Sequence, residues 1–178
     1  IMLLDEPFSS LDARLRDRIR DDTLHLLKRN GTATMLVTHD PEEALFMADR
    51  IAVMRDGRIV QQGNPTDIYC NPVDPFVVRF FGDVNELRGI VSDGRVETPL
   101  GPVNAGNIKD GTPVQVLIRP EALQVEMRQA PRDHSTSHVL MSRLLGGVSF
   151  IHLCVHQGND EYHMHAHMPG VFLPDRND

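Results

Sequence analysis

The sequence predicts a fold in two parts, an α/β region over residues 1–82 and an all-β region over residues 83–178. In the first part, short apolar runs alternate with segments of helical periodicity, which is typical of parallel strands joined by helical crossovers. In the second part, helical periodicity fades, and Gly, Pro, Asn and Asp separate strand-like runs, which indicates a small β-barrel or sandwich. We therefore place the boundary near Gly82–Val84.

The α/β assignment starts from two short apolar runs. The run IMLL at 1–4 is continuous and apolar, which is typical of a strand buried on both faces. The run TATMLVTH at 32–39 predicts a second buried strand. Between them, apolar residues at helical spacing predict a helix over 13–31 that stops at Asn30-Gly31. The order strand, helix, strand favours a parallel pair.

A second helix and a hairpin complete the first part. The segment DPEEALFMADR, residues 40–50, opens with an aspartate that can cap, a proline suited to the first turn and two glutamates that favour the positive end of the helix dipole. Two strands around Asp56-Gly57 then predict a hairpin over 51–63. Two short helical patches follow over 64–82.

The all-β assignment depends on strand-like runs at 87–98, 111–120 and 148–169. Within it, Pro120 favours a tight helical corner, LLGG at 144–147 predicts a turn, and residues 129–138 predict a polar loop.

Composition excludes several classes of protein. The chain is 40% hydrophobic and 24% charged, which is ordinary for a globular protein. Its net charge of −7 argues against a nucleic-acid binder that uses a broad basic surface. The two cysteines, Cys70 and Cys154, are far apart, which favours free thiols in a reducing compartment. No apolar run approaches the roughly 20 residues of a membrane span, and no secretory signal is visible.

Two carboxylates, Asp5 and Glu6, directly follow the first predicted strand. Open α/β sheets bind ligands at the carboxyl ends of their strands. A carboxylate there can hold hydrated Mg²⁺, and a second one can polarise a water for attack on a phosphoryl group. The alternative is that the two acids merely begin a helix.

His39 ends the second predicted strand. If the two strands are neighbours, His39 reaches the same edge of the sheet as Asp5, where it can contact a terminal phosphate or hold the attacking water. The alternative is an ordinary strand-end side chain with local partners. The succession of acidic pair, helix, strand and histidine favours the first interpretation.

These motifs resemble those of ATP-binding cassette (ABC) transporter ATPases. The run IMLLDEP resembles their Walker B strand, so that Asp5 matches the magnesium-associated aspartate and Glu6 the catalytic glutamate. The run VTHD resembles the switch-histidine motif, which implies that His39 lies beside the γ-phosphate. The run SSLD resembles the D-loop, which lies across the ATPase dimer interface in the family and here comprises Ser9, Ser10, Leu11 and Asp12.

The resemblance extends over nearly the whole chain. Residues 42–72 are similar to importer ATPases, and FVVRFFGDVNEL at 76–87 leads on as in the subgroup that handles iron, polyamines, sugars or sulfate. The run VLIRPEAL at 116–123 is typical of the accessory transport-associated (TOBE) domain. The resemblance thus implies the distal half of a P-loop NTPase-type ABC ATPase sheet in 1–82 and an OB-like TOBE barrel in 83–178.

The resemblance also implies a function and partners. It implies an importer ATPase that uses ATP and Mg²⁺ and couples hydrolysis to uptake of ferric iron, a polyamine, a sugar or sulfate. The implied partners are a second ATPase subunit, membrane permease subunits and, indirectly, a solute-binding protein. The implied location is the cytoplasmic face of the inner membrane, as a peripheral subunit.

Two further motifs of the family do not occur in the 178 residues. There is no Gly-x-x-x-x-Gly-Lys-Ser/Thr phosphate loop, whose amides and lysine cradle phosphates, and no signature beginning Leu-Ser-Gly-Gly. Ile1 already lies inside an apolar run, so we interpret the chain as a C-terminal fragment with further sequence upstream. We expect that it alone neither binds nor hydrolyses ATP appreciably. The alternative function is a non-catalytic regulatory or dimerisation module whose β-domain binds a small ligand or a metal.

Seven of the nine histidines lie after residue 130. His163, His165 and His167 alternate, so on a strand they share one face and can bind zinc, copper or nickel. His152 and His156 can add ligands across a hairpin. The alternative is a solvent-facing row whose intervening residues point inward. The sequence places no cysteine near this row, and no acidic residue spaced for an obvious site.

Overall fold

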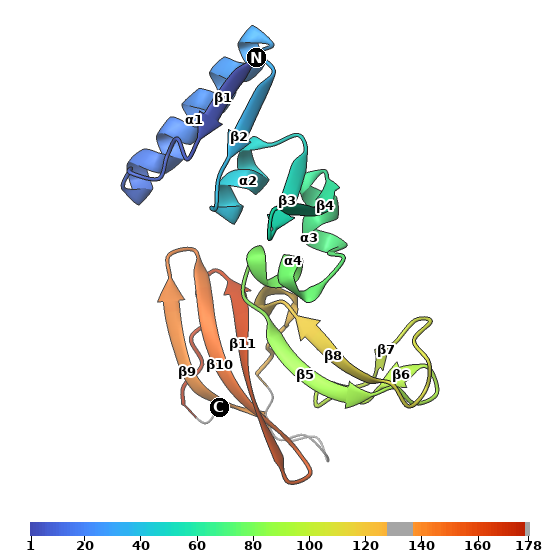
Figure 1. The fold of residues 1–178 in the computed structure, drawn as a ribbon. Coiled ribbons are helices and arrows are strands. Elements are labelled where there is room, and N and C mark those ends of the chain that lie inside the picture. Colours follow the sequence, from blue (N-terminus) through green and yellow to red (C-terminus); the bar gives the residue numbers. More distant parts are fainter. Residues whose placement is uncertain (128–136, 177–178) are drawn as a thin grey trace. The chain divides into compact units, whose positions relative to one another are not determined.

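The computed structural model describes residues 1–127 and 137–176. The chain divides into two compact units, Ile1–Gly82 and Asp83–Asp178. Figure 1 shows helices and short strands in the first unit and mainly strands in the second. In the part of the chain that the structure describes, no helix has the length and apolarity to cross a membrane.

The first unit begins with a parallel pair of strands joined by a helix (Figure 1). Strand β1, Met2–Asp5, pairs with β2, Thr34–Val37, and helix α1, Ala13–Asn30, connects them. Helix α1 begins after Asp12, which accepts a hydrogen bond from the Leu15 N–H, and ends at Gly31 with φ of 59°. The predicted strand, helix, strand order and the Asn30-Gly31 stop are confirmed.

The prediction that both strands are buried is wrong. Leu3 is 70% exposed and Met35 is 59% exposed, and α1 has no buried residue. A parallel strand is buried on both faces only when other elements cover the sheet on both sides. In the described residues this sheet has two strands and few covering elements, so apolar side chains that would suit a sheet interior face solvent.

The remainder of the first unit is a helix, a hairpin and two short helices. Helix α2 spans Pro41–Met47, and β3, Ile51–Arg55, pairs with the antiparallel β4, Arg58–Gly63. The predicted hairpin is confirmed: Asp56 and Gly57 both have positive φ, 52° and 74°, as a type I′ turn requires. The two helical patches are α3, Pro65–Cys70, and α4, Pro75–Phe80.

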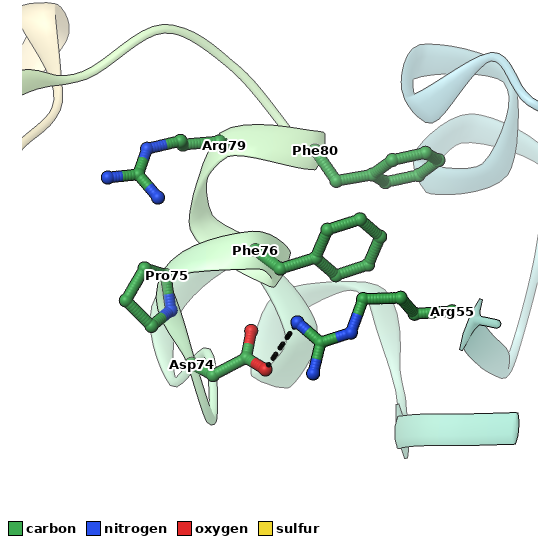
Figure 2. Close-up of a pocket in the computed structure, with 6 residues that line it drawn as sticks. All are labelled: Arg55, Asp74, Pro75, Phe76, Arg79 and Phe80. Carbon is green, nitrogen blue, oxygen red and sulfur yellow. Dashed lines mark ion pairs between the residues drawn. The ribbon is translucent and has the colours of Figure 1, made fainter.

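The hairpin and the last two helices form the core of the first unit, which consists of Ile51, Val53, Ile68, Val77 and Phe81. At its edge, an ion pair of 3.2 Å joins Arg55 to Asp74, and the Arg55 guanidinium lies 5.0 Å from the centre of the Phe76 ring. Figure 2 shows these side chains around a pocket that is also lined by Pro75, Arg79 and Phe80. Arg55 thus ties the hairpin to the start of α4.

In its described residues, the second unit contains three small antiparallel sheets. Strand β5, Asn85–Ile90, pairs with β8, Pro113–Ile118, and β6, Arg95–Val96, pairs with β7, Val103–Asn104. The third sheet has the order β9-β10-β11 and comprises β9, Ser137–Leu145, β10, Val148–Gln157, and β11, Asp160–Pro169. The predicted β-rich second part is therefore confirmed as antiparallel structure.

The connections of the second unit also agree with the sequence. A 3₁₀ turn at Pro120–Ala122 confirms the helical corner, and Gly146-Gly147 form the turn between β9 and β10. The predicted polar loop over 129–138 lies outside the described residues except for Ser137 and His138, which belong to β9.

The three-stranded sheet contributes most of the core of the second unit. One of its faces supplies Val155 and Met164 to a buried cluster that also contains Leu87 of β5, and it supplies Val139, Ile151 and Ala166 to a second cluster. The buried Asn85 side chain joins β5 to β11, because its Oδ1 accepts the His165 N–H at 2.7 Å and its Nδ2 donates to the His165 carbonyl at 2.8 Å. Non-local contacts therefore hold this unit together.

Candidate functional site

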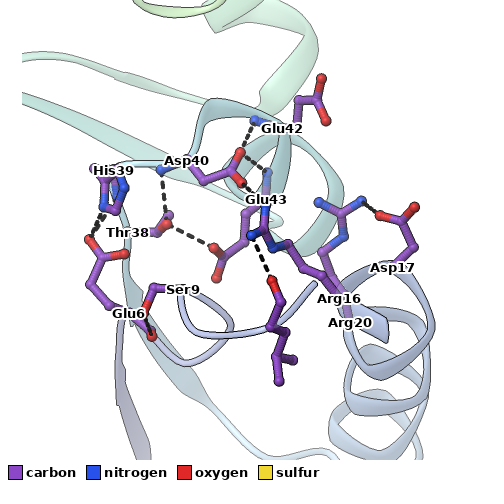
Figure 3. Close-up of polar contacts among 11 residues, drawn as sticks. Glu6, Ser9, Arg16, Asp17, Arg20, Thr38, His39, Asp40, Glu42 and Glu43 are labelled. Atoms are coloured by element: carbon purple, nitrogen blue, oxygen red, sulfur yellow. Dashed lines mark hydrogen bonds and ion pairs between the residues drawn. The ribbon is translucent and has the colours of Figure 1, made fainter. Parts of the chain in front are cut away.

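Glu6 and His39 meet at the carboxyl edge of the β1–β2 sheet (Figure 3). The Glu6 carboxylate accepts the backbone N–H of His39 at 3.0 Å and lies 2.6 Å from its Nδ1 atom through the same oxygen, Oε1. The Glu6 N–H donates to the Val37 carbonyl at 2.9 Å, so the strand pairing continues one residue past β1. Parallel pairing of consecutive strands is what brings together two residues 33 positions apart.

The backbone of Glu6 is unusual. Its φ of 46° lies in the left-handed region, which residues other than glycine seldom adopt. This conformation turns the chain sharply away from β1 immediately after Asp5. The two neighbouring acids therefore have different surroundings: Glu6 is half-buried against His39, whereas Asp5 is exposed at the strand end.

The charge of Glu6 acts on His39. The hydrogen bond and the negative charge of Glu6 raise the pKa of His39 above its ordinary value of 6.5, and the carboxylates of Asp40 and Glu43 add to the effect. When protonated, His39 donates through Nδ1 to Glu6 and has a second N–H on a side chain that is 79% exposed. That second donor suits an anionic oxygen.

The loop that carries His39 is held by a network at the start of α2 (Figure 3). Thr38 Oγ1 donates to Glu43 Oε2 at 2.8 Å and accepts the Asp40 N–H at 3.0 Å. Asp40 Oδ1 in turn accepts the N–H groups of Glu42 and Glu43, which confirms its predicted capping role. This network fixes the backbone on both sides of His39.

Glu43 is a member of the network that its position in the sequence did not reveal. It is 2% exposed, and burial raises its pKa, while the hydrogen bond from Thr38 acts in the opposite direction. Its Oε1 atom is buried without a hydrogen-bond partner in the described part of the chain. From the sequence we expected this glutamate only to interact favourably with the helix dipole. The sequence does not show which carboxylate of the first turn faces the interior.

The segment Ser9–Asp12 leads from Glu6 into α1. Ser9 Oγ donates to the Glu6 carbonyl at 3.0 Å, and Asp12 is the cap of α1. Arg16 donates to the Leu11 carbonyl at 2.9 Å and lies 3.7 Å from the Asp40 carboxylate, so it links this segment to the His39 loop. Ser9 and Ser10 are exposed.

The histidine row of β11 follows the predicted alternation. Met164 and Ala166 are buried, whereas His163 and His165 are exposed and His167 is half-exposed. Alternate residues of a strand stand about 6.6 Å apart. In the described part of the chain, the donor atoms of these three rings do not gather closely enough to hold one ion.

The rings of this row have different neighbours. His163 Nδ1 lies 3.1 Å from His152 Nε2, while the His167 ring lies 5.7 Å from that of Phe150. Burial lowers the pKa of His152, and the nearby His165 and His163 lower it further.

Comparisons with known proteins show which proteins this chain is similar to. The chain is 46% identical over 133 residues to the sulfate/thiosulfate import ATP-binding protein CysA 2 of Chromobacterium violaceum, a match that covers 74% of this chain and 36% of the relative. It is 42% identical over 136 residues to the spermidine/putrescine import ATP-binding protein PotA of Oleidesulfovibrio alaskensis, covering 71% of this chain and 36% of the relative. No protein-family model matches the chain.

A third relative is the Fe(3+) ions import ATP-binding protein FbpC of Pseudomonas fluorescens. It is 42% identical over 148 residues, which cover 83% of this chain and 42% of the relative. The chain thus spans somewhat more than a third of the length of the curated relatives it matches. With identities of 41–46% over about three quarters of the chain, its homologues are the ATP-binding subunits of ABC importers.

Proposed function

We propose that this chain supplies the hydrolytic part of the ATPase subunit of an ABC importer, which couples ATP hydrolysis to solute uptake. The observation that carries the proposal is the Glu6–His39 pair at the carboxyl edge of two parallel strands. A strand edge of this kind is where α/β sheets hold their ligands. The relatives are all named import ATP-binding proteins, which supports the assignment.

Glu6 and His39 have complementary roles in the proposed reaction. Without substrate, one Glu6 oxygen contacts both the backbone N–H and the ring Nδ1 of His39. The terminal phosphate of ATP would compete for the histidine, because a protonated imidazole also donates to phosphate oxygens. Glu6 would then accept a proton from the attacking water, whose oxygen bonds to the γ-phosphorus as the bond to the ADP oxygen breaks.

Asp5 suits the proposed metal role by its chemistry and position. It is an exposed carboxylate at the end of β1, adjacent to Glu6, and carboxylate oxygens are the donors that Mg²⁺ prefers. Mg²⁺, when bound there through water, would neutralise charge on the phosphates. Asp5 would hold the ion while Glu6 stays available for water.

The remaining parts of the proposal concern partners and domains. Ser9, Ser10, Leu11 and Asp12 would contact a second ATPase subunit, and permease subunits would place the protein on the cytoplasmic face of the membrane, with a solute-binding protein as an indirect partner. Residues 1–82 would be the distal part of the nucleotide-binding domain, and 83–178 an OB-like TOBE domain. The named relatives import different solutes, so we assign no solute.

The test is replacement of Glu6 by Gln in a protein of the relatives' length that contains these residues. Because the amide cannot take the proton from water, we expect turnover to fall by about 10²–10⁴-fold, with ATP binding retained. Phosphate release and nucleotide titration measure the two effects. The matched control is Glu42→Gln, which removes an exposed carboxylate of the same chemistry from the first turn of α2. Near-normal turnover of the Glu6 variant would contradict the role.

A second experiment concerns the 178 residues by themselves. Since they contain no phosphate loop, we expect no appreciable binding of Mg-ATP to this chain. Isothermal titration calorimetry measures this directly. Micromolar affinity would show that the residues present hold nucleotide without that loop.

A further inference from the structure

A second group of potential ligands lies on the face of the β9-β10-β11 sheet that points away from the core. On this face His138 of β9 stands opposite Cys154 of β10, and His156 follows two residues later on β10. One donor atom from each of these three side chains lies within 4.8 Å of the others. The group lies outside the machinery proposed above, and it differs from the alternating row on β11.

The contacts within the group are close. Cys154 Sγ lies 3.3 Å from His156 Nε2, and the rings of His138 and His156 stack with their centres 5.4 Å apart. Cys154 is fully buried, whereas the two histidines are half-buried. The thiol therefore lies beneath two imidazoles that reach solvent, so an ion can approach by displacing a ring.

These separations suit a metal centre. Tetrahedral zinc bonds sulfur at about 2.3 Å and nitrogen at about 2.0–2.1 Å, which places a sulfur and a nitrogen ligand roughly 3.5 Å apart. The observed 3.3 Å between Cys154 and His156 is close to that spacing. Two imidazoles and one thiolate are also the donors that Zn²⁺ and related transition metals prefer over oxygen-only sites.

Glu161 of β11 completes the surroundings of the thiol. Its carboxylate accepts a hydrogen bond from Cys154 Sγ at 3.1 Å and lies 3.1 Å from His163 Nε2. Burial, with the hydrogen bond and charge of Glu161, raises the pKa of Cys154 to about 11, so the metal-free residue is a neutral thiol. Glu161 thus holds the sulfur close to the two histidines and joins this group to the β11 row.

We propose that His138, Cys154 and His156 bind one divalent transition-metal ion of the Zn²⁺ class, with Glu161 as a positioning residue. On binding, the Cys154 S–H bond breaks, its proton leaves to solvent, and a sulfur–metal bond forms. The two imidazoles bind as neutral ligands, and water takes the fourth position. The ion would crosslink β9 to β10 and so stabilise the second unit.

This site differs from the one expected on sequence grounds. Of the histidines named there, only His156 is a ligand, while His163 makes a contact to Glu161. The expectation that no cysteine lies near was wrong, because the cysteine comes from β10 and approaches through strand pairing. The strand register brings these three ligands from two strands together, and the sequence alone does not give that register.

Cobalt substitution tests the proposal, because Co²⁺ bound to a thiolate gives a near-ultraviolet charge-transfer band and tetrahedral Co²⁺ gives intense visible bands. We expect the 178-residue chain to show both bands at one equivalent and Zn²⁺ to displace them. Cys154→Ser should remove the charge-transfer band, and His138→Gln should weaken binding at least tenfold. Cys70→Ser is the matched control, since Cys70 is an exposed free cysteine in the first unit.

The outcomes separate the possible sites. Circular dichroism of each metal-free variant shows whether it folds. If Cys154→Ser does not fold, His138→Gln still tests the proposal, because His138 is only half-buried. Loss of the bands in the His163→Gln/His165→Gln double variant, with retention in His138→Gln, would move the site to the β11 row and overturn the proposal. A spectrum of octahedral Co²⁺ without the charge-transfer band would also overturn it.

Discussion

The β1–β2 sheet and the β9-β10-β11 sheet present polar groups in different ways. In the first, the side chains of the candidate site stand at strand ends, and apolar residues such as Leu3 are exposed along the strands. In the second, polar residues line one face while the opposite face is buried, with Ile151 fully inaccessible. The first sheet lacks a core of its own in the described residues, whereas the second is part of one.

This difference shows that a site and a core can be separate properties of a sheet. The Glu6–His39 contact depends only on two strands pairing in parallel, so it forms at the edge of a sheet with exposed faces. The group around Cys154 depends on the register of three strands and on a packed face beneath it. Experiments on stability should therefore separate the two sheets clearly.

Hydrogen exchange should show the largest difference. We expect the central amides of β10, which is paired on both sides, to open with free energies approaching the global stability, about 5–15 kcal/mol, and those of β1 and β2 to open with free energies near zero. Exchange measured on the same sample by mass spectrometry or NMR provides both values. Equal protection of the two sheets would show that exposed apolar faces do not weaken β1–β2.

Truncation of apolar side chains gives the next largest effect. Ile151→Ala removes a fully buried side chain and should lower the free energy of unfolding by about 2–5 kcal/mol. Leu3→Ala is the control in the other sheet, where a 70% exposed side chain should change stability by no more than about 0.5 kcal/mol. Urea denaturation followed by circular dichroism measures both. A large effect of Leu3→Ala would mean that β1 is covered in solution.

Polar side chains that join elements should also differ in how much they stabilise the two units, but by less than the apolar side chains do. Asn85→Ala should destabilise the second unit by about 1–3 kcal/mol, because backbone groups of β8 and β11 lose a buried partner. Asp40→Ala, which removes the local cap of α2 and a partly exposed 3.7 Å ion pair with Arg16, should cost about 1 kcal/mol. Thermal unfolding of the two variants compares a non-local tie with a local one. An Asp40 effect larger than the Asn85 effect would reverse the expected order.

The smallest effect is electrostatic and concerns His39. Because Glu6 raises its pKa, the pair favours the folded state fully below pH 6.5, and this contribution disappears as the pH rises through the raised pKa. Glu6→Gln should lower the pKa of His39 toward 6.5, while the charges of Asp40 and Glu43 remain. NMR titration of the imidazole measures the change, with Glu42→Gln as the control. An unchanged pKa would contradict the pairing.

Much of the first unit could be predicted because its signals are local. The cap at Asp40, the stop at Gly31 and the turn at Asp56-Gly57 each depend on a few neighbouring residues, and the structure confirms all three. The exposure of β1 and β2 could not be predicted in this way. An apolar run suggests burial, but burial requires other elements to cover the sheet.

The candidate sites show the same division. The sequence by itself determined that Glu6 and His39 follow consecutive apolar strands, and parallel pairing makes such residues neighbours. Only the tertiary structure decided that Glu43 is buried and accepts a hydrogen bond from Thr38, and that Cys154 lies close to both His138 and His156. The physical reason is separation along the sequence. Caps and turns are set by residues a few positions apart, whereas strand register and burial depend on the chain as a whole.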